Sequence, residues 1–249
     1  MDGGDRTMLR IFVLGLLLML ISCTDSTGPV IIDNSFLTII DTSTGSVEAS
    51  IELDALNGDL CVTSDGSSAY VVDMMGYSGM SIIQIDCNSY SISGGIDLGW
   101  SCQDLCLNDQ ETELYVLAMD QVYVIDIPLM TISDSITLNQ ALSMNIVQRP
   151  GTDLVYVTHS MPSSVSIVDT QQGIIVDSLV FSFEDWIDPV FSQSGDNLYV
   201  VRNTSIYRMD PDTGQEMGMK DVGEAIACIC MNSGSNTLYA TWGEMGSFL

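Results

Sequence analysis

Short apolar runs alternate with turn-forming Gly, Asn, Asp and Ser residues along most of the chain. Runs of this length, bounded by such residues, are typical of β-strands joined by hairpins. In the unit 188–222 the pattern predicts four strands, at 189–191, 198–201, 205–209 and 215–220. No stretch after residue 30 has a convincing helical period, and the pattern therefore predicts an all-β protein.

The four-strand pattern repeats along the chain, and two markers give its period. The first marker is a tyrosine in an apolar run, which recurs at Tyr70, Tyr115, Tyr156, Tyr199 and Tyr239. The second is an aspartate that ends an apolar run, which recurs at Asp41, Asp86, Asp126, Asp169 and Asp210. Both markers are spaced by 40 to 45 residues. Four strands in a repeat of this length are typical of a propeller blade, so we expect a β-propeller of four-stranded antiparallel blades.

The repeats place about five blades in one domain, residues 30–249. Their approximate bounds are 30–53, 58–99, 103–138, 145–181, 188–222 and 226–249. The first repeat begins at a second strand, whereas the last supplies an innermost strand at 226–231 and a further second strand at 238–241. The two ends overlap instead of completing one blade. Two interpretations stay open: an incomplete piece of a larger propeller, and a five-bladed ring with a displaced tail.

Each marker aspartate begins a hairpin between a third and a fourth strand. In three repeats a glycine follows four residues later, in the pairs Asp41 and Gly45, Asp169 and Gly173, and Asp210 and Gly214. An Asp side chain can bond backbone N–H groups just after it, and Gly tolerates the positive φ that closes such a turn. We therefore interpret these aspartates as turn residues and not as metal ligands or catalytic groups.

Two segments carry a resemblance to a known family. Residues 154–159 (LVYVTH) with 165–173 (VSIVDTQQG) resemble the YVTN β-propeller repeat, and 30–45 (VIIDNSFLTIIDTSTG) is a second match. His159 stands where this family usually has Asn. The resemblance implies a propeller of exported or surface proteins of bacteria and archaea, and it implies no single activity, because this fold serves many functions.

The first residues are predicted to be a targeting segment. Arg6 and Arg10 precede the apolar run 11–21, which is short for a membrane span and has the length of a signal-peptide core. The run ends in Leu-Ile-Ser-Cys, which resembles the lipobox of bacterial lipoproteins. We expect a signal peptide at 1–22, a lipid on Cys23 and a tether at 23–29, and hence an extracytoplasmic, membrane-anchored protein. An ordinary signal peptide and an uncleaved anchor remain the alternatives.

The chain is strongly acidic, with 33 Asp and Glu against 6 Lys and Arg and a net charge of −27. This charge repels phosphate backbones, so we expect no nucleic-acid partner. It favours basic partners, such as an envelope protein, a basic peptide or wall material, and it attracts divalent cations. A solvated acidic surface and a dedicated cation site both remain open. We expect contact with the membrane through the lipid anchor only.

Six cysteines follow Cys23: Cys61, Cys87, Cys102, Cys106, Cys228 and Cys230. An even number outside the cytoplasm permits disulfides, with many connectivities open. Three of them, Cys61, Cys106 and Cys230, lie nine residues before a marker tyrosine, where other repeats have Val147 and Val190. This mixture predicts a small, buried apolar position on the innermost strand. A thiolate metal site is the alternative, although the spacings are not typical of zinc.

No familiar catalytic motif occurs in the chain, and we nominate no catalytic or metal-binding residue and no cofactor. His159 is expected in a loop, at the surface, and Trp100, Trp186 and Trp242 are expected to pack near strand ends. The leading hypothesis is an exported, membrane-tethered propeller lipoprotein that acts as a binding scaffold at the cell envelope. The alternatives are the propeller domain of a periplasmic quinoprotein-like oxidoreductase, and an adhesion or surface-layer component.

Overall fold

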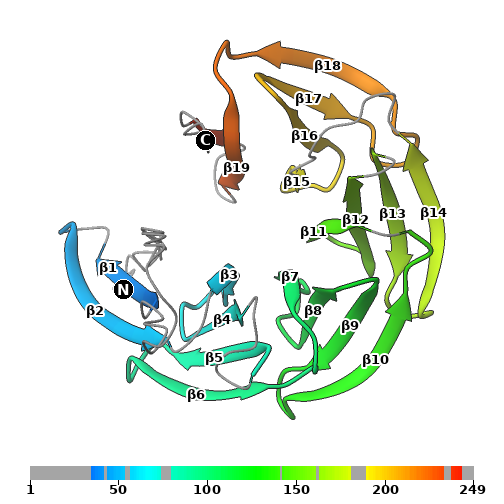
Figure 1. Cartoon of the computed structure of the whole chain (residues 1–249). Coiled ribbons are helices and arrows are strands. Elements are labelled where there is room, and N and C mark those ends of the chain that lie inside the picture. Colours follow the sequence, from blue (N-terminus) through cyan, green and yellow to red (C-terminus); the bar gives the residue numbers. More distant parts are fainter. Residues whose placement is uncertain are drawn as a thin grey trace, which may run out of the picture. The chain divides into compact units, whose positions relative to one another are not determined.

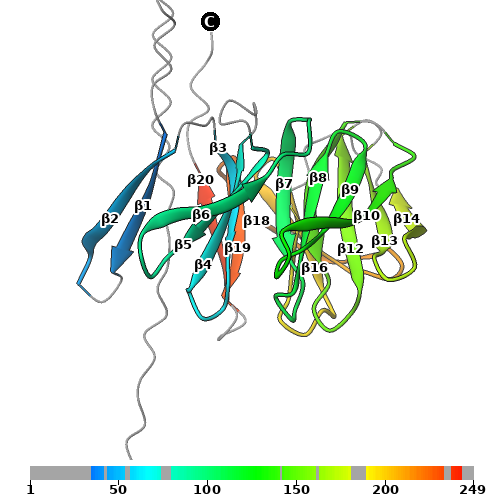
Figure 2. The ribbon, with the colours of Figure 1, turned by 90° about the horizontal axis from the view of Figure 1, so that it is seen from below.

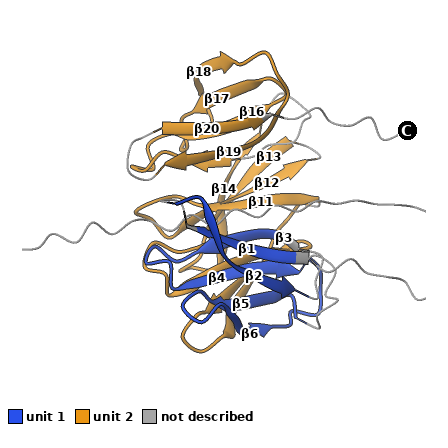
Figure 3. Ribbon diagram, turned by 90° about the vertical axis from the view of Figure 1, so that its left-hand side faces the viewer, with its two compact units in different colours: residues 1–101 blue, residues 102–249 orange. Residues whose placement is uncertain are grey.

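A computed structural model describes residues 35–41, 44–53, 57–73, 80–140, 142–160, 163–180, 189–232 and 237–242. The expected signal peptide, Cys23 and the tether lie outside the described residues, as does Trp186. All regular structure in the described residues is β-strand. The chain divides into two compact units, residues 1–101 and 102–249, which are coloured separately in Figure 3.

Unit 1 contains two antiparallel sheets. The first pairs β1 (Ser35–Asp41) with β2 (Ser46–Leu53). The second has the order β3-β4-β5-β6, with β3 at Asn57–Val62, β4 at Ser68–Asp73, β5 at Ile82–Asp86 and β6 at Ser91–Ile96. Buried side chains of β1 and β2, including Leu37 and Ile39, pack against Val71 and Ile85 of the second sheet.

Unit 2 contains three sheets of four strands, each in sequence order from the innermost strand outward, and a sheet of two strands (Figures 1 and 2). The first holds β7 (Cys102–Leu107), β8 (Glu113–Ala118), β9 (Gln121–Asp126) and β10 (Thr131–Thr137). The second holds β11 (Ser143–Gln148), β12 (Leu154–Ser160), β13 (Ser163–Asp169) and β14 (Ile174–Val180). The third holds β15 (Pro189–Phe191), β16 (Leu198–Arg202), β17 (Ser205–Met209) and β18 (Glu216–Asp221). The last pairs β19 (Ile226–Asn232) with β20 (Thr237–Trp242).

The strand predictions for 188–222 are confirmed, and so are the innermost and second strands predicted in the last repeat. Of the three strands predicted for 30–53, the third and fourth are β1 and β2, and the second lies outside the described residues. The inner strands β4, β8 and β13 are buried on both faces, whereas the outer strands β10 and β18 are mostly exposed. Sheets whose central strands are apolar on both faces must pack against a neighbour on each side, which is why successive sheets stack.

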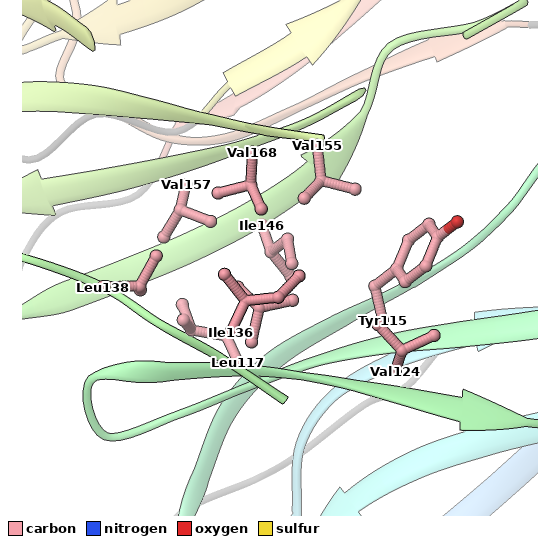
Figure 4. Packing of buried hydrophobic residues seen from close by; sticks show 10 residues of the cluster. Tyr115, Leu117, Val124, Ile136, Leu138, Ile146, Val155, Val157 and Val168 are labelled. Carbon is pink, nitrogen blue, oxygen red and sulfur yellow. The ribbon is translucent and has the colours of Figure 1, made fainter. Parts of the chain in front are cut away.

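Successive sheets of unit 2 pack face to face through branched apolar side chains. Val122 and Val124 of β9 and Ile136 of β10 meet Val155 and Val168 of the next sheet. Figure 4 shows this packing for Val124, Ile136, Val155 and Val168. The next interface repeats this arrangement one sheet further along, and there the rings of Tyr156 and Phe191 meet edge to face with centroids 4.9 Å apart. Burial between the sheets therefore holds unit 2 together.

Two marker tyrosines are bonded to the residue that follows a marker aspartate in the neighbouring sheet. The hydroxyl of Tyr156, which is buried, donates to the carbonyl of Pro211, 3.1 Å away, directly after the marker Asp210 of the next sheet. One sheet earlier, Thr170 follows Asp169 and donates its hydroxyl to the buried Tyr115 hydroxyl at 3.1 Å. The second strand of one sheet is thereby tied to the hairpin of the next.

The marker aspartates have the turn role that the sequence predicts. Oδ1 of Asp169 accepts the backbone N–H groups of Gln171 and Gln172, two and three residues further on, at 3.0 and 2.8 Å. Asp86 and Asp210 make the same pairs of bonds, which lower the pKa of both carboxyls. Hydrogen bonds that stabilise the charged form have this effect.

The residue four positions after each marker aspartate has a positive φ in every repeat, whether or not it is glycine. The φ values are 72° at Gly45, 53° at Tyr90, 48° at Met130, 67° at Gly173 and 66° at Gly214. Side chains with a Cβ adopt this left-handed conformation at a cost of about 1–2 kcal/mol. The bonds of the aspartate therefore hold the turn even where the glycine is missing.

Candidate functional site

His159 lies in β12 and is 1% exposed, so the expectation of a surface residue in a loop is wrong. The strand continues to Ser160 and turns the ring into the sheet interface. A buried imidazole needs partners for both nitrogens. Two serines supply them, because Ser143 Oγ lies 3.1 Å from Nδ1 and Ser166 Oγ lies 2.8 Å from Nε2.

The environment of His159 keeps the ring neutral. Burial lowers the pKa of His159 to about 4, because the charged form would lose its hydration there. In the neutral ring one nitrogen donates and the other accepts, and a serine hydroxyl can meet either requirement. Because Ser143 and Ser166 are themselves buried, the trio positions the backbone of three adjacent strands and does not present a nucleophile to solvent.

The connection that leads into Ser143 and the turn bonded to that connection are two loops at one end of unit 2, and we call these loops the loop pair. They are the β8–β9 turn, Met119 and Asp120, and the β10–β11 connection, residues 138–140 with Leu142. The N–H of Leu138 donates to the carbonyl of Asp120 at 2.7 Å, which joins the two loops directly.

Side chains of the next sheet hold the connection in place. The buried Ser164 donates its hydroxyl to Oε1 of Gln140 at 2.5 Å. At the other end of the connection, the N–H of Ser160 donates to the carbonyl of Leu142 at 3.1 Å. The loop pair is therefore fixed by both the sheet before it and the sheet after it.

A buried carboxylate joins the innermost strands beneath the loop pair. Asp104 of β7 accepts the N–H of Ile146 of β11 on Oδ2 at 2.7 Å, and the N–H of Leu105 on Oδ1 at 2.7 Å. The adjacent Gln103 accepts the N–H of Met119 at 2.9 Å. Strand β7 is therefore bonded both to β11 and to the β8–β9 turn.

Two large apolar residues of the loop pair combine exposure with an unfavourable backbone. Met119 has φ 57° and Leu142 has φ 60°, in the left-handed region that bulky side chains rarely adopt. Their side chains are 52% and 55% exposed, so burial does not compensate this cost. Strained backbone of this kind concentrates at functional sites and is a reason to look for a function there.

The cysteine positions correspond in register, as the repeat spacing implies. Cys61, Cys106 and Cys230 pair with Tyr70, Tyr115 and Tyr239, directly opposite on the second strand. The expectation of a buried position is wrong, however, because Cys61 and Cys106 are partly exposed and Cys230 is exposed. In the described part of unit 2, β19–β20 is the last sheet, so no later sheet of that unit covers Cys230.

The six cysteines of the described residues are present as thiols, and Cys87 and Cys102 are the buried ones. Burial raises the pKa of the Cys87 thiol, which makes it less reactive. Trp100 lies between β6 and β7, near strand ends as expected, and is 58% exposed, whereas the side chain of Trp242 is outside the described part.

Within the described ranges no three or more His, Cys, Asp and Glu side chains gather as they would around a metal ion. The described residues also contain no helix of the length and apolarity needed to cross a membrane.

Two solved structures resemble this one over most of its length. Hydrazine synthase of Kuenenia stuttgartiensis superimposes with a TM-score of 0.68 at 16% identity, over 82% of this chain and 67% of that one. A protein described as functionally unknown, from Desulfotomaculum acetoxidans, gives 0.70 at 13% identity, over 83% of this chain and 69% of that one. This chain folds as a β-propeller. Its four-stranded sheets are the propeller blades that the repeat predicts.

At such low identity the likeness concerns the fold, and the same propeller fold can serve different functions. No family model and no curated protein matches the chain. The candidate site of this propeller is therefore defined by its own residues: the loop pair and the cluster of Ser143, His159 and Ser166 beneath it.

Proposed function

We propose that this β-propeller is an exported binding scaffold, held at the cell envelope by a lipid on Cys23, whose partner is basic. The observation that carries the proposal is the exposure of its acidic groups. Among the described Asp and Glu side chains, Asp73 and Asp104 are buried, and the others are partly or fully exposed. A field of one sign over a protein surface attracts partners of the opposite sign and speeds their association.

The few basic groups do little to offset this field. Arg149 is largely buried between blades, where it forms an ion pair with Asp212 and donates Nε–H to the carbonyl of Gly195 at 3.1 Å. The neighbouring Asp212 carboxylate is the main reason that the pKa of Arg149 is raised. This arginine therefore serves the packing of blades, and its charge is paired with Asp212.

The envelope location rests on the sequence. Arg6 and Arg10, the apolar run 11–21 and the Leu-Ile-Ser-Cys segment follow one another in the order of a lipoprotein signal. The YVTN-type segments 154–159 and 165–173 support the same location, because such repeats occur mainly in exported proteins. A single acyl modification gives weak membrane attachment, whereas the multiple chains of a bacterial lipoprotein give a stable anchor.

One experiment tests both parts of this proposal. The tagged chain and its Cys23→Ala variant are expressed in a bacterium that processes lipoproteins, and intact cells are treated with an amine-to-carboxylate crosslinker. The wild type should fractionate with membranes, show an intact mass that begins at Cys23 with added acyl mass, and crosslink to a basic envelope component. The variant should lose the acyl mass and the crosslink.

A soluble wild-type product that begins at another residue would overturn the lipid anchor. Crosslinks from the wild type that go only to acidic or neutral proteins would overturn the basic partner.

A further inference from the structure

We propose that Met119 and Leu142 anchor a docking surface for a basic segment that carries an apolar side chain. This inference rests on the proposed function, because it assumes a basic partner, and it adds the place and the chemistry of recognition. The surface is the loop pair, at the end of unit 2 formed by β8–β9 and β10–β11.

The backbone of Met119 is the first reason. The equivalent turn two blades later, between β16 and β17, has Asn203 at the same position, with φ 53°. Asn is one of the residues that enter the left-handed region readily, whereas Met is not. The turn would thus form more easily with Asn. A long apolar side chain there is explained by contact with something outside the chain.

The rigidity of the loop pair is the second reason. The bond from Leu138 to Asp120 joins the two loops, and the buried Ser164 holds Gln140. Directly after Leu142, Ser143 is bonded to the buried His159. Apolar side chains on a fixed backbone lose little entropy when a partner covers them, which favours binding.

The charge around the anchors is the third reason, and it selects a basic occupant. Asp120, in the turn with Met119, is exposed. The corresponding loops two blades later are joined in the same way, by a bond from the N–H of Val222 to the carbonyl of Thr204 at 2.8 Å. At the equivalent end of that blade, Asp221, the last residue of β18, and Glu224 of the connection are exposed. An acidic end with apolar tips is complementary to a segment of Lys or Arg with Leu-like side chains.

The probes for the test are three labelled synthetic octapeptides, one alternating Lys and Leu, one of Lys only, and one alternating Glu and Leu. Their affinities for the full chain in detergent are measured by fluorescence anisotropy. The Lys-Leu peptide should bind at least about fivefold more tightly than the Lys peptide, since it buries apolar surface as well. The Glu-Leu peptide should bind most weakly.

The informative variant is Met119→Asn, which installs the residue found at the equivalent turn. It should raise the melting temperature by about 2–4 °C, because strain is relieved. It should also lower the affinity for the Lys-Leu peptide by about tenfold and leave the affinity for the Lys peptide unchanged. The matched control is Met130→Gly at the opposite end of the blade, which relieves the same strain. It should raise the melting temperature similarly and change neither affinity.

Equal affinity of Met119→Asn and wild type for the Lys-Leu peptide would overturn the docking surface. Equal binding of the Lys-Leu and Lys peptides would also overturn it, while leaving the proposed basic partner intact. If none of the cationic peptides binds more tightly than the Glu-Leu peptide, the proposed function itself is contradicted. The stability of each variant shows separately that the chain remains folded.

Discussion

At the scale of single residues, hydrogen bonds to an aspartate side chain hold a backbone conformation that the residue type in the turn disfavours. Tyr90 and Met130 take the left-handed backbone that glycine takes in other hairpins. In both hairpins the marker aspartate accepts backbone N–H groups: Asp86 those of Asn88 and Ser89, and Asp126 that of Leu129 at 2.8 Å. The sequence predicts the turns that contain Gly, but not these two, because their residue types argue against a positive φ.

The buried His159 gives the protein a defined response to acid. The unfolded chain binds a proton at His159 near pH 6.5, but the folded protein does so only near pH 4. As the pH falls through this window the unfolded state takes up the proton first, so stability present above pH 6.5 is lost. His159→Asn should abolish this loss, which amounts to roughly 3 kcal/mol for the single group.

The measurement is urea unfolding of both proteins at a series of pH values. Carboxylates titrate in both proteins, so the difference between the two curves isolates the histidine. The variant should be less stable by about 1–2 kcal/mol near pH 7.5, where an amide cannot satisfy both serines, and the gap should close or reverse near pH 4. A constant gap at all pH values would show that His159 is not held neutral by burial.

At the scale of strands and hairpins, the bond between a marker tyrosine and the next hairpin contributes to the free energy of unfolding, and this contribution can be measured. Tyr156→Phe removes the donor and leaves the carbonyl of Pro211, which is in a buried residue, without this partner. The cost should be about 1–2 kcal/mol in the free energy of unfolding. Tyr199→Phe is the matched control, since that ring is partly exposed, and it should cost under about 0.5 kcal/mol.

Chemical denaturation of the two variants gives both values under the same conditions. Equal losses for Tyr156→Phe and Tyr199→Phe would mean that the repeated tyrosine acts through its ring and not through its hydroxyl.

The strands themselves could be predicted because their signals are local. The limits of 205–209 follow from an apolar run and the turn residues beside it. The burial of His159 and the exposure of Cys230 could not be predicted in this way, because burial depends on which sheet packs against a strand. The loop pair was missed for the same reason, although Met119 in a two-residue turn, where Asn203 occurs in another repeat, was a visible signal.

At the scale of the whole molecule, the net charge of −27 sets the response to salt. Like charges on a folded surface repel one another, and this repulsion lowers stability. Raising NaCl from about 10 mM to about 150 mM shortens the screening length from roughly 30 Å to roughly 8 Å. We therefore expect the melting temperature to rise over this range.

Magnesium and calcium chloride at matched ionic strength test the nature of the effect. If screening is the cause, they should raise the melting temperature by about as much as NaCl does. If either divalent ion raises the melting temperature further in high NaCl, the protein has a dedicated cation site, and screening alone does not explain the effect.

The bond that Thr170 donates to Tyr115 and the bond that Tyr156 donates to Pro211 also bear on how such a chain can change in evolution. Each bond joins one repeat to the next, and each repeat supplies a tyrosine on one side and a hairpin on the other. Duplication or loss of one whole repeat therefore recreates the same contact at the new junction. The number of repeats can change by recombination without a new interface, whereas an exchange that cuts through a repeat separates its tyrosine from its hairpin.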